Sequence, residues 1–290
     1  MVTSVVRQVA KASVYPYRRI QAMRTLRVMS AHPNPSIAAL GAAVRDGVAG
    51  RFAPIEGAWI KHIEHRRDEL LNNHNEIQYT DYGAGSTSPR NIVSQPDENS
   101  TTTLTVSKMC EASRPPFWGG ILFRLIREFR PVTCIELGTC LGISGSYQAA
   151  ALRMNSTGSL RTLEGSAALA SLAEETFELL GVENTTVVPG PFRETLVDVL
   201  KAAGPVDYMF NDGHHDRDAV LEYFEKSLPY LSNQAIMVFD DINWSPGMRD
   251  AWKTIKADPR VAETVDLRQL GIALIGDYGL DHKVNYHAPL

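Results

Sequence analysis

The stretch Ile135–Ser144, which reads IELGTCLGIS, decides the fold of this chain, because a buried strand pattern ends there in a glycine turn and a helix pattern follows. In sheets of parallel strands, ligands bind beyond the carboxyl ends of the strands, and glycines in such a turn let a ligand approach the backbone closely. A dinucleotide-binding turn would carry a further glycine where this chain has Cys140. Glu136, near the end of the strand, suits a cationic ligand better than a diphosphate. A tight turn that binds no ligand is the alternative interpretation.

Outward from this turn, apolar strand patterns alternate with helix patterns. The strand patterns lie at residues 133–136, 160–164, 186–188, 206–212 and 235–240, and the helix patterns at 144–154, 168–180, 192–203 and 216–228. A further helix pattern at 244–257 precedes a strand pair around 264–267 and 272–275. We therefore predict an α/β fold: a doubly wound, mostly parallel, seven-stranded Rossmann-like sheet with a C-terminal antiparallel strand pair and an N-terminal helical extension.

The N-terminal part of the chain does not show this alternation of strand and helix patterns. Helix patterns occur at 58–72, 106–112 and 117–129, and a polar stretch rich in Ser, Thr, Asn and Pro occupies 81–103. Its glycine-rich start, Asp81–Ser86, resembles a cofactor turn, but no helix pattern follows it, so we interpret the stretch as a lid-like loop. The expected division is an N-terminal basic arm, helical extension and loop over 1–103, and the main α/β domain over 104–290.

Basic residues are unevenly placed in this chain of 290 residues, whose formal net charge is −4. The segment Met1–Arg45 has no acidic residue but carries Arg7, Lys11, Arg18, Arg19, Arg24, Arg27 and Arg45. A basic arm on an acidic body does not fit a dedicated nucleic-acid-binding protein, so we expect no nucleic-acid partner. The arm is either a solvated or partner-bound helix, a helix that contacts an anionic membrane surface peripherally, or an organelle-targeting sequence.

Cysteine content and hydropathy bear on the location of the protein. The chain has three cysteines, which is too few for a disulfide framework and fits a reducing compartment. No apolar run is long enough to span a bilayer. We therefore expect a cytoplasmic protein, with any membrane contact limited to the basic arm.

Five segments together resemble a known family: Ile135–Ile143, Thr162–Ser166, Val187–Phe192, Val206–His215 and Ile236–Gly247. They resemble class I S-adenosylmethionine-dependent methyltransferases, and within these the metal-dependent O-methyltransferases of the catechol and caffeoyl-CoA type and of the macrolide-sugar type. The resemblance covers about residues 106–275 and implies S-adenosylmethionine as the cofactor. The residues it assigns to cofactor binding are Glu136, Gly138, Gly142, Ser144, Glu164, Gly165, Gly190, Phe192 and Asp212. The first three would line the methionine part, Glu164 would bind the ribose hydroxyls, and Gly190–Phe192 would border the adenine.

Acidic residues follow two strands that the expected strand order makes neighbours. Asp212 ends the fourth strand pattern, and Asp240 and Asp241 end the fifth. Carboxylates that converge on a small volume repel one another unless protons or a cation neutralise them, and oxygen ligands favour a hard cation. The resemblance assigns these three residues to a divalent metal, Mg²⁺ or another divalent cation. An acid at Asp241 follows the macrolide-sugar type, whereas the catechol type has Asn there.

Two adjacent histidines come soon after Asp212. His215 follows Asp212 by three residues, the spacing at which the macrolide-sugar type carries its general base. A neutral imidazole can take a proton from a hydroxyl at physiological pH. His214 is the rival, and a loop histidine without a catalytic role is a third interpretation. A histidine-ligated zinc site is disfavoured because three acids lie nearby.

The sequence thus predicts an enzyme, an S-adenosylmethionine-dependent O-methyltransferase. It would move a methyl group to a hydroxyl of a small molecule, assisted by a divalent metal and a histidine base. The alternatives are a metal-independent methyltransferase, a non-catalytic cofactor-binding protein and, from the sheet alone, a nucleotide-dependent oxidoreductase. The methyl acceptor and the oligomeric state are left open, with a homodimer as one option.

Overall fold

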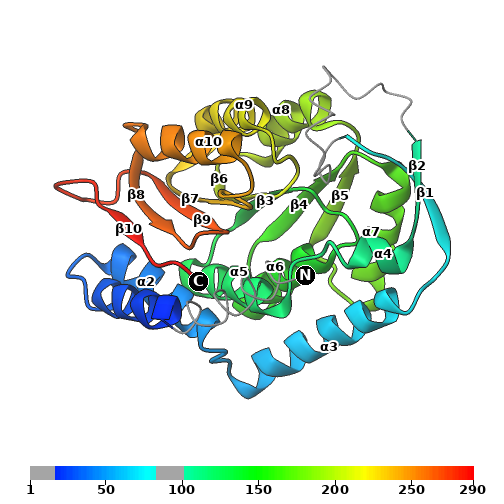
Figure 1. The fold of residues 1–290 in the computed structure, drawn as a ribbon, viewed down its shortest axis with the longest axis horizontal. Coiled ribbons are helices and arrows are strands. Elements are labelled where there is room, and N and C mark those ends of the chain that lie inside the picture. Colours follow the sequence, from blue (N-terminus) through cyan, green and yellow to red (C-terminus); the bar gives the residue numbers. More distant parts are fainter. Residues whose placement is uncertain (1–16, 83–100) are drawn as a thin grey trace, which may run out of the picture.

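A mixed sheet forms the centre of the molecule, with the strand order β10-β8-β9-β7-β6-β3-β4-β5 (Figure 1). The computed structural model describes residues 17–82 and 101–290. The strands of this sheet are β3 (Thr133–Leu137), β4 (Ser159–Glu164), β5 (Thr185–Pro189), β6 (Val206–Asn211), β7 (Leu231–Phe239), β8 (Val261–Asp266), β9 (Gly271–Gly276) and β10 (Asn285–His287). Strands β3 to β7 pair in parallel, and β9 pairs antiparallel with both β7 and β8. The strand order reverses between β3 and β6, which is where ligands bind in sheets of this kind.

The sheet has eight strands, one more than the seven that the sequence predicts. The additional strand is β10, which pairs in parallel with the residues 264–266 of β8. It is three residues long, too short for an apolar alternation to reveal it. The rest of the architecture is the α/β fold that we predict, with a mostly parallel, doubly wound sheet.

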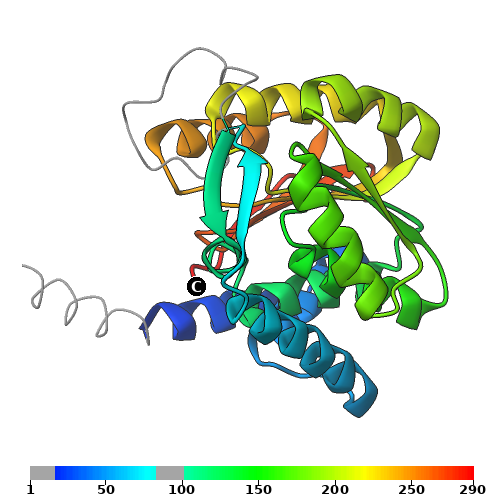
Figure 2. The same ribbon diagram turned by 90° about the vertical axis from the view of Figure 1, so that its right-hand side faces the viewer.

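Helices cover both faces of the sheet, and each layer has its own hydrophobic cluster (Figures 1 and 2). One layer contains α5 (Pro116–Phe129), α6 (Ile143–Asn155) and α7 (Ala167–Leu179), and the other contains α8 (Phe192–Ala203), α9 (Arg217–Ser227) and α10 (Pro246–Ala257). Local signals begin the two helices that follow β6 and β7. The Asp216 side chain accepts from the first backbone N–H groups of α9, and Ser245 does the same for α10, where Pro246 takes the first position.

The N-terminal extension packs against the α5–α6 layer. It consists of a helix over residues 17–30, α2 (Pro35–Val48), α3 (Pro54–Leu71), the hairpin of β1 (Glu76–Thr80) and β2 (Thr101–Thr105), and α4 (Val106–Cys110). Leu26, Leu40 and Ile63 are fully buried in the same cluster as the apolar side of α5. The extension therefore shares a core with the α/β domain, and the boundary expected at 103/104 falls inside β2.

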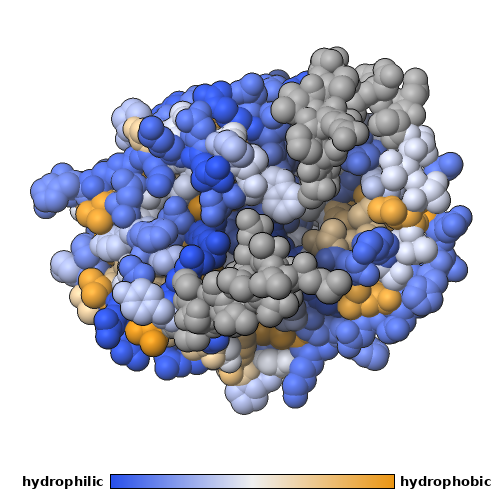
Figure 3. All heavy atoms as spheres, in the orientation of Figure 1, coloured by the Kyte–Doolittle hydropathy of each residue, from blue (hydrophilic) through white to orange (hydrophobic). Residues whose placement is uncertain are grey.

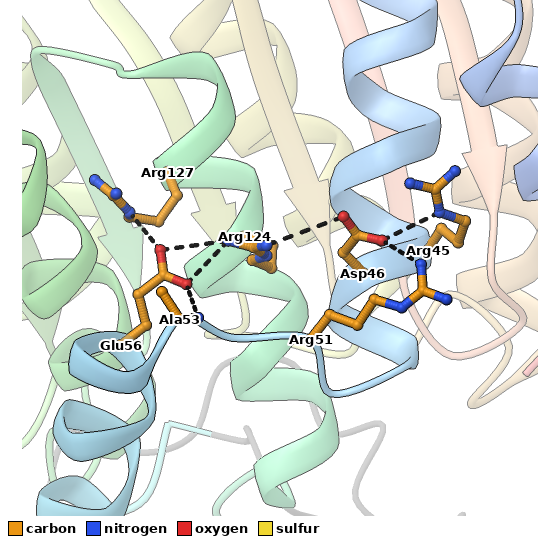
Figure 4. Close-up of polar contacts among 7 residues, drawn as sticks. All are labelled: Arg45, Asp46, Arg51, Ala53, Glu56, Arg124 and Arg127. Atoms are coloured by element: carbon orange, nitrogen blue, oxygen red, sulfur yellow. Dashed lines mark hydrogen bonds and ion pairs between the residues drawn. The ribbon is translucent and has the colours of Figure 1, made fainter.

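The buried carboxylate of Glu56 connects α3 to α5 through ion pairs (Figure 4). Glu56 is 3% exposed and accepts a hydrogen bond from the backbone N–H of Ala53, at 2.8 Å, which caps the start of α3. The same carboxylate pairs with Arg127 at 2.9 Å and with Arg124 at 3.2 Å, both on α5. Because removing one partner of a buried ion pair leaves the other uncompensated, this cluster holds the extension in a defined position.

The segments expected as an arm and a lid are only partly described. Arg7 and Lys11 lie outside the described residues, as does most of the loop expected at 81–103. Within the described part of the chain, no helix is long and apolar enough to cross a membrane. The face seen in Figure 3 is mainly hydrophilic, with hydrophobic residues in small groups.

Candidate active site

The glycine turn after β3 packs directly against the end of β6. Gly138 has a φ of +96°, and a Cβ atom at this position would lie 2.6 Å from the carbonyl oxygen of Asp212. Gly142, with a φ of +81°, immediately precedes α6. Both glycines are therefore required by the backbone itself, since side chains rarely adopt such φ values. The turn and Asp212 are held at the same edge of the sheet, as the sequence predicts.

Glu136 lies beneath this turn. It is fully buried, and it accepts hydrogen bonds from Ser144, Gln148 and Thr162, each at 2.7 Å. Burial raises the pKa of Glu136 to about 7, even though these hydrogen bonds favour the carboxylate. Glu136 and Ser144 are therefore in direct contact. One carboxylate oxygen atom of Glu136 accepts from Ser144 and Gln148 on α6, and the other accepts from Thr162 on β4, so Glu136 connects the turn and α6 to β4.

Glu164, at the end of β4, connects the first turn to the second. Its two carboxylate oxygen atoms accept from the backbone N–H groups of Cys140, at 2.8 Å, and Ser166, at 3.0 Å. It is 8% exposed, and burial raises its pKa. The next residue, Gly165, is covered by an aromatic ring: a Cβ atom there would lie 2.5 Å from the ring of Tyr82. Tyr82 comes from the end of the β1–β2 hairpin and carries no signal in the sequence that would place it here.

The turn after β5 joins the same edge. The backbone N–H of Gly190 donates to the carbonyl oxygen of Glu164 at 2.8 Å. The Phe192 ring packs on Gly213, where a Cβ atom would lie 2.1 Å from it, and meets the His214 ring edge-on at 5.6 Å. The residues predicted to bind a cofactor therefore converge on one edge, although they come from four separate turns.

The two candidate histidines have different surroundings. His214 accepts a hydrogen bond at Nδ1 from the Tyr223 hydroxyl, at 2.9 Å, and donates from Nε2 to the carbonyl oxygen of Tyr82, at 2.8 Å. Burial lowers its pKa, which favours the neutral ring that this pattern needs. His214 thus connects the end of the hairpin, through Tyr82, to helix α9, through Tyr223. His215 instead faces carboxylates: its Nε2 lies 3.4 Å from Asp212 Oδ1 and 3.7 Å from Asp241 Oδ2.

Three carboxylates gather at the ends of β6 and β7. Burial and the adjacent charge of Asp212 raise the pKa of Asp240 well above its ordinary value. Burial opposes ionisation of Asp212 too, but hydrogen bonds with His215 and Asp240 hold its pKa below the ordinary value. Asp241 sits at a φ of +49°, a conformation that turns the chain sharply after β7. These carboxylates lie so close together that protons or a cation must balance their negative charge.

The potential metal ligands differ from the predicted set in one member. Single ligand atoms of Asp212, His215 and Asp240 lie within 4.8 Å of one another, and among the described residues these three form the group suited to an ion. Asp241 is not part of that group, although the resemblance assigns it to the metal. Asp212 and Asp240 are common to both sets.

Sequence reasoning missed a cation in this cluster. Arg114 forms an ion pair through Nε with Asp240, and its Nη2 lies 2.7 Å from Asp241 Oδ1. It comes from the short connection between α4 and α5, far from both acids in the sequence, and no pattern marks it. The positive charge of Arg114 balances part of the negative charge described above.

Comparison with known proteins gives a family match over part of the chain and several similar folds. Residues 135–242 match the model of a family described as a methyltransferase domain. An O-methyltransferase from Bacillus cereus in complex with SAH is 24% identical, with a TM-score of 0.51 over 58% of this chain and 85% of that chain. An SAH-bound methyltransferase from Podospora anserina is 18% identical, with a TM-score of 0.51 over 58% of this chain and 82% of that chain. Curated proteins gave no match.

These likenesses to solved structures show the fold. The family match, which covers residues 135–242, agrees with the class I S-adenosylmethionine-dependent methyltransferase domain expected from the sequence. The family match spans β3 to β7, the part of the chain that contains all the predicted site residues.

Proposed function

We propose that this protein transfers the methyl group of S-adenosylmethionine to a hydroxyl oxygen of a small molecule. The observation that carries the proposal is the position of His215, between Asp212 and Asp241 and beside the glycine turn packed on Asp212. A group that can accept a proton thus stands at the edge where the cofactor binds in this fold class. The fold shared with an O-methyltransferase supports oxygen as the acceptor atom.

His215 is the general base of the proposed reaction. A hydroxyl is a poor nucleophile until it loses its proton, and a neutral imidazole can take that proton near physiological pH. The imidazolium that forms would face two carboxylates at 3.4 and 3.7 Å, which stabilise its positive charge. The remaining task of the domain is to hold the acceptor oxygen and the methyl group in line at near-contact distance.

The glycine turn suits the cofactor. Gly138 and Gly142 leave the backbone open to close approach, and Glu164 stands at the end of the next strand, where an acid binds ribose hydroxyls in this type of sheet. Tyr82, which covers Gly165, is placed to contact the adenosine part. These residues, with Gly190 and Phe192, form the proposed cofactor site.

The carboxylate cluster fits a divalent cation such as Mg²⁺. Its donors are oxygen-rich, and the cluster already attracts a cationic side chain, that of Arg114. Asp212 and Asp240 would hold the ion, with Asp241 adjacent. When bound, the ion would lower the pKa of the acceptor hydroxyl and orient it. His215 then remains the base, and its second carboxylate neighbour keeps its ring oriented.

The helix over residues 17–30 supports a peripheral membrane contact. Its exposed side carries apolar and basic residues together: Tyr17, Ile20, Arg24, Arg27 and Val28. No acidic residue lies in this helix. A helix face with this composition suits the headgroup region of an anionic membrane.

A turnover screen tests the proposed activity. The full-length protein is incubated with S-adenosylmethionine and catechols, hydroxylated polyketides, sugars or lipid-like alcohols, and release of S-adenosylhomocysteine is measured. We expect turnover with at least one hydroxyl class, its loss in EDTA and its recovery with Mg²⁺ or Mn²⁺. Turnover that is unaffected by EDTA would remove the metal from the proposal, and it would leave a metal-independent methyltransferase. Failure to bind S-adenosylhomocysteine in calorimetry would contradict the proposed activity itself.

A further inference from the structure

The guanidinium of Arg114 occupies the carboxylate cluster although it comes from outside the family match. Its Nε pairs with Asp240, whose side chain is 1% exposed, and its Nη2 pairs with Asp241 at 2.7 Å. The Arg114 side chain itself is 17% exposed, so one side of it remains accessible to solvent. A buried carboxylate without a counter-charge is strongly unfavourable, and here Arg114 supplies that charge.

The backbone that carries Arg114 is fixed from the other side. Arg67, on α3, donates to the carbonyl oxygen of Arg114 at 2.6 Å. Arg67 is in turn paired with Glu64 at 2.9 Å, and Glu64 accepts from the Tyr147 hydroxyl, on α6, at 2.7 Å. Pro115 and Pro116 follow directly and restrict the chain further. Only the side chain of Arg114 is therefore free to leave the cluster, while its anchor stays in place.

A guanidinium and a divalent cation cannot bind these carboxylates independently. Both need the oxygen atoms of Asp240, and two positive groups in one small volume repel each other. On the basis of the proposed metal-assisted function, we infer that Arg114 is a resident cation that competes with the divalent metal for Asp240. The metal binds as the Arg114 side chain withdraws, so this residue of the extension sets the metal affinity of the α/β domain.

Metal binding by Arg114 variants tests this inference without cofactor or acceptor. Mn²⁺ affinity is measured by electron paramagnetic resonance and calorimetry for the wild type, Arg114→Met and Arg114→Lys. A matched control, Arg260→Met, removes the same charge from an exposed ion pair with Asp258 and Glu225. We expect Arg114→Met to bind Mn²⁺ about 10- to 100-fold more tightly than the wild type, at the lower end of the effects measured for close charge pairs. Arg114→Lys, which keeps the charge but loses the forked geometry, should be intermediate, and the control should match the wild type.

Thermal unfolding gives a second readout that is independent of activity. Without metal, Arg114→Met should melt at a lower temperature than the wild type, because its carboxylates have lost their counter-charge. Saturating Mn²⁺ should raise its melting temperature by more than that of the wild type. Should Arg114→Met fail to fold without metal, Arg114→Lys must still bind Mn²⁺ more tightly than the wild type.

Equal or weaker Mn²⁺ affinity in the Arg114 variants would overturn the inference and leave the proposed function standing. If neither the wild type nor any variant binds Mn²⁺, the inference and the metal in the proposed function fail together. Calorimetry with S-adenosylhomocysteine then shows separately whether the methyltransferase proposal survives.

Discussion

The turns of the parallel strands and the N-terminal extension meet at one edge of the sheet, but they contribute to it by different means. The turns are joined through backbone groups: Gly138 N–H donates to the carbonyl oxygen of Leu163 at 3.0 Å, and Gly190 N–H to that of Glu164 at 2.8 Å. The extension contributes side chains, namely Tyr82 on Gly165 and Arg114 among the carboxylates. The α/β domain thus supplies the turns of the proposed cofactor site, whereas the cover of that site and the charge balance of the cluster depend on the extension.

The two histidines give the largest expected contrast between these regions. His215→Ala should lower kcat by about 10²–10⁴, the usual contribution of a positioned base, and should leave the affinity for S-adenosylhomocysteine unchanged. His214→Ala releases the hairpin from the sheet, so it should weaken cofactor affinity and have the smaller effect on kcat. Kinetics with an acceptor found in the screen, together with calorimetry, separate the two patterns.

Raising the pH should distinguish the two histidine variants further by their kcat. Hydroxide can replace a missing imidazole as base, so raising the pH should partly restore His215→Ala but not His214→Ala. If the two variants lose the same fraction of kcat at all pH values, the assignment of separate roles to the adjacent histidines is wrong.

The stability of the α/β domain should depend on pH through Glu136. Its pKa is about 7 in the folded protein, against an ordinary value of 4.5, so the unfolded chain releases this proton first. The free energy of unfolding should therefore fall as the pH rises from about 4.5 to 7 and level off above, by at most ~1.4 kcal/mol per pH unit for this group. Glu136→Gln, which cannot ionise, should flatten that part of the profile in urea unfolding.

A second buried carboxyl serves as the control for Glu136. Burial also raises the pKa of Glu263, on β8 at the other end of the sheet, to about 7. Glu263→Gln should flatten the same pH window without changing cofactor affinity, because it lies outside the proposed site. Profiles for Glu136→Gln that run parallel to the wild type would show that Glu136 stays ionised in the folded protein.

Glu164 tests the contribution of the α/β domain to cofactor binding. Glu164→Ala leaves ribose hydroxyls and two backbone N–H groups without their acceptor, so we expect a loss of about 1–3 kcal/mol in S-adenosylhomocysteine affinity. Arg67→Met, in the extension, should leave that affinity unchanged while it loosens the backbone of Arg114. Unchanged affinity in Glu164→Ala, measured by calorimetry, would exclude Glu164 from the ribose site.

The sequence reveals the parts of the site that local rules build. Glycines at positive φ, acids at strand ends and the alternation of strands and helices are local patterns, and parallel topology brings the strand ends to one edge. Arg114 is separated from Asp240 by 126 residues and Tyr82 from His214 by 132, and neither contact leaves a periodic trace. The choice between the adjacent histidines likewise needs Tyr82 and Tyr223, which only the folded chain brings to His214.

The smallest expected effect concerns the outer surface of the extension. Arg24→Gln combined with Arg27→Gln removes two exposed charges from the helix over residues 17–30 and touches no part of the proposed site. Because a basic residue near an anionic membrane contributes about 1 kcal/mol, binding to phosphatidylserine vesicles at low salt should fall roughly 10- to 30-fold. The matched control, Lys201→Gln combined with Lys253→Gln, removes two exposed charges from α8 and α10 and should bind like the wild type. Wild-type binding should weaken as salt rises, since the Debye length shortens. A wild-type protein that does not sediment with such vesicles even at low salt would show that this helix face has another role.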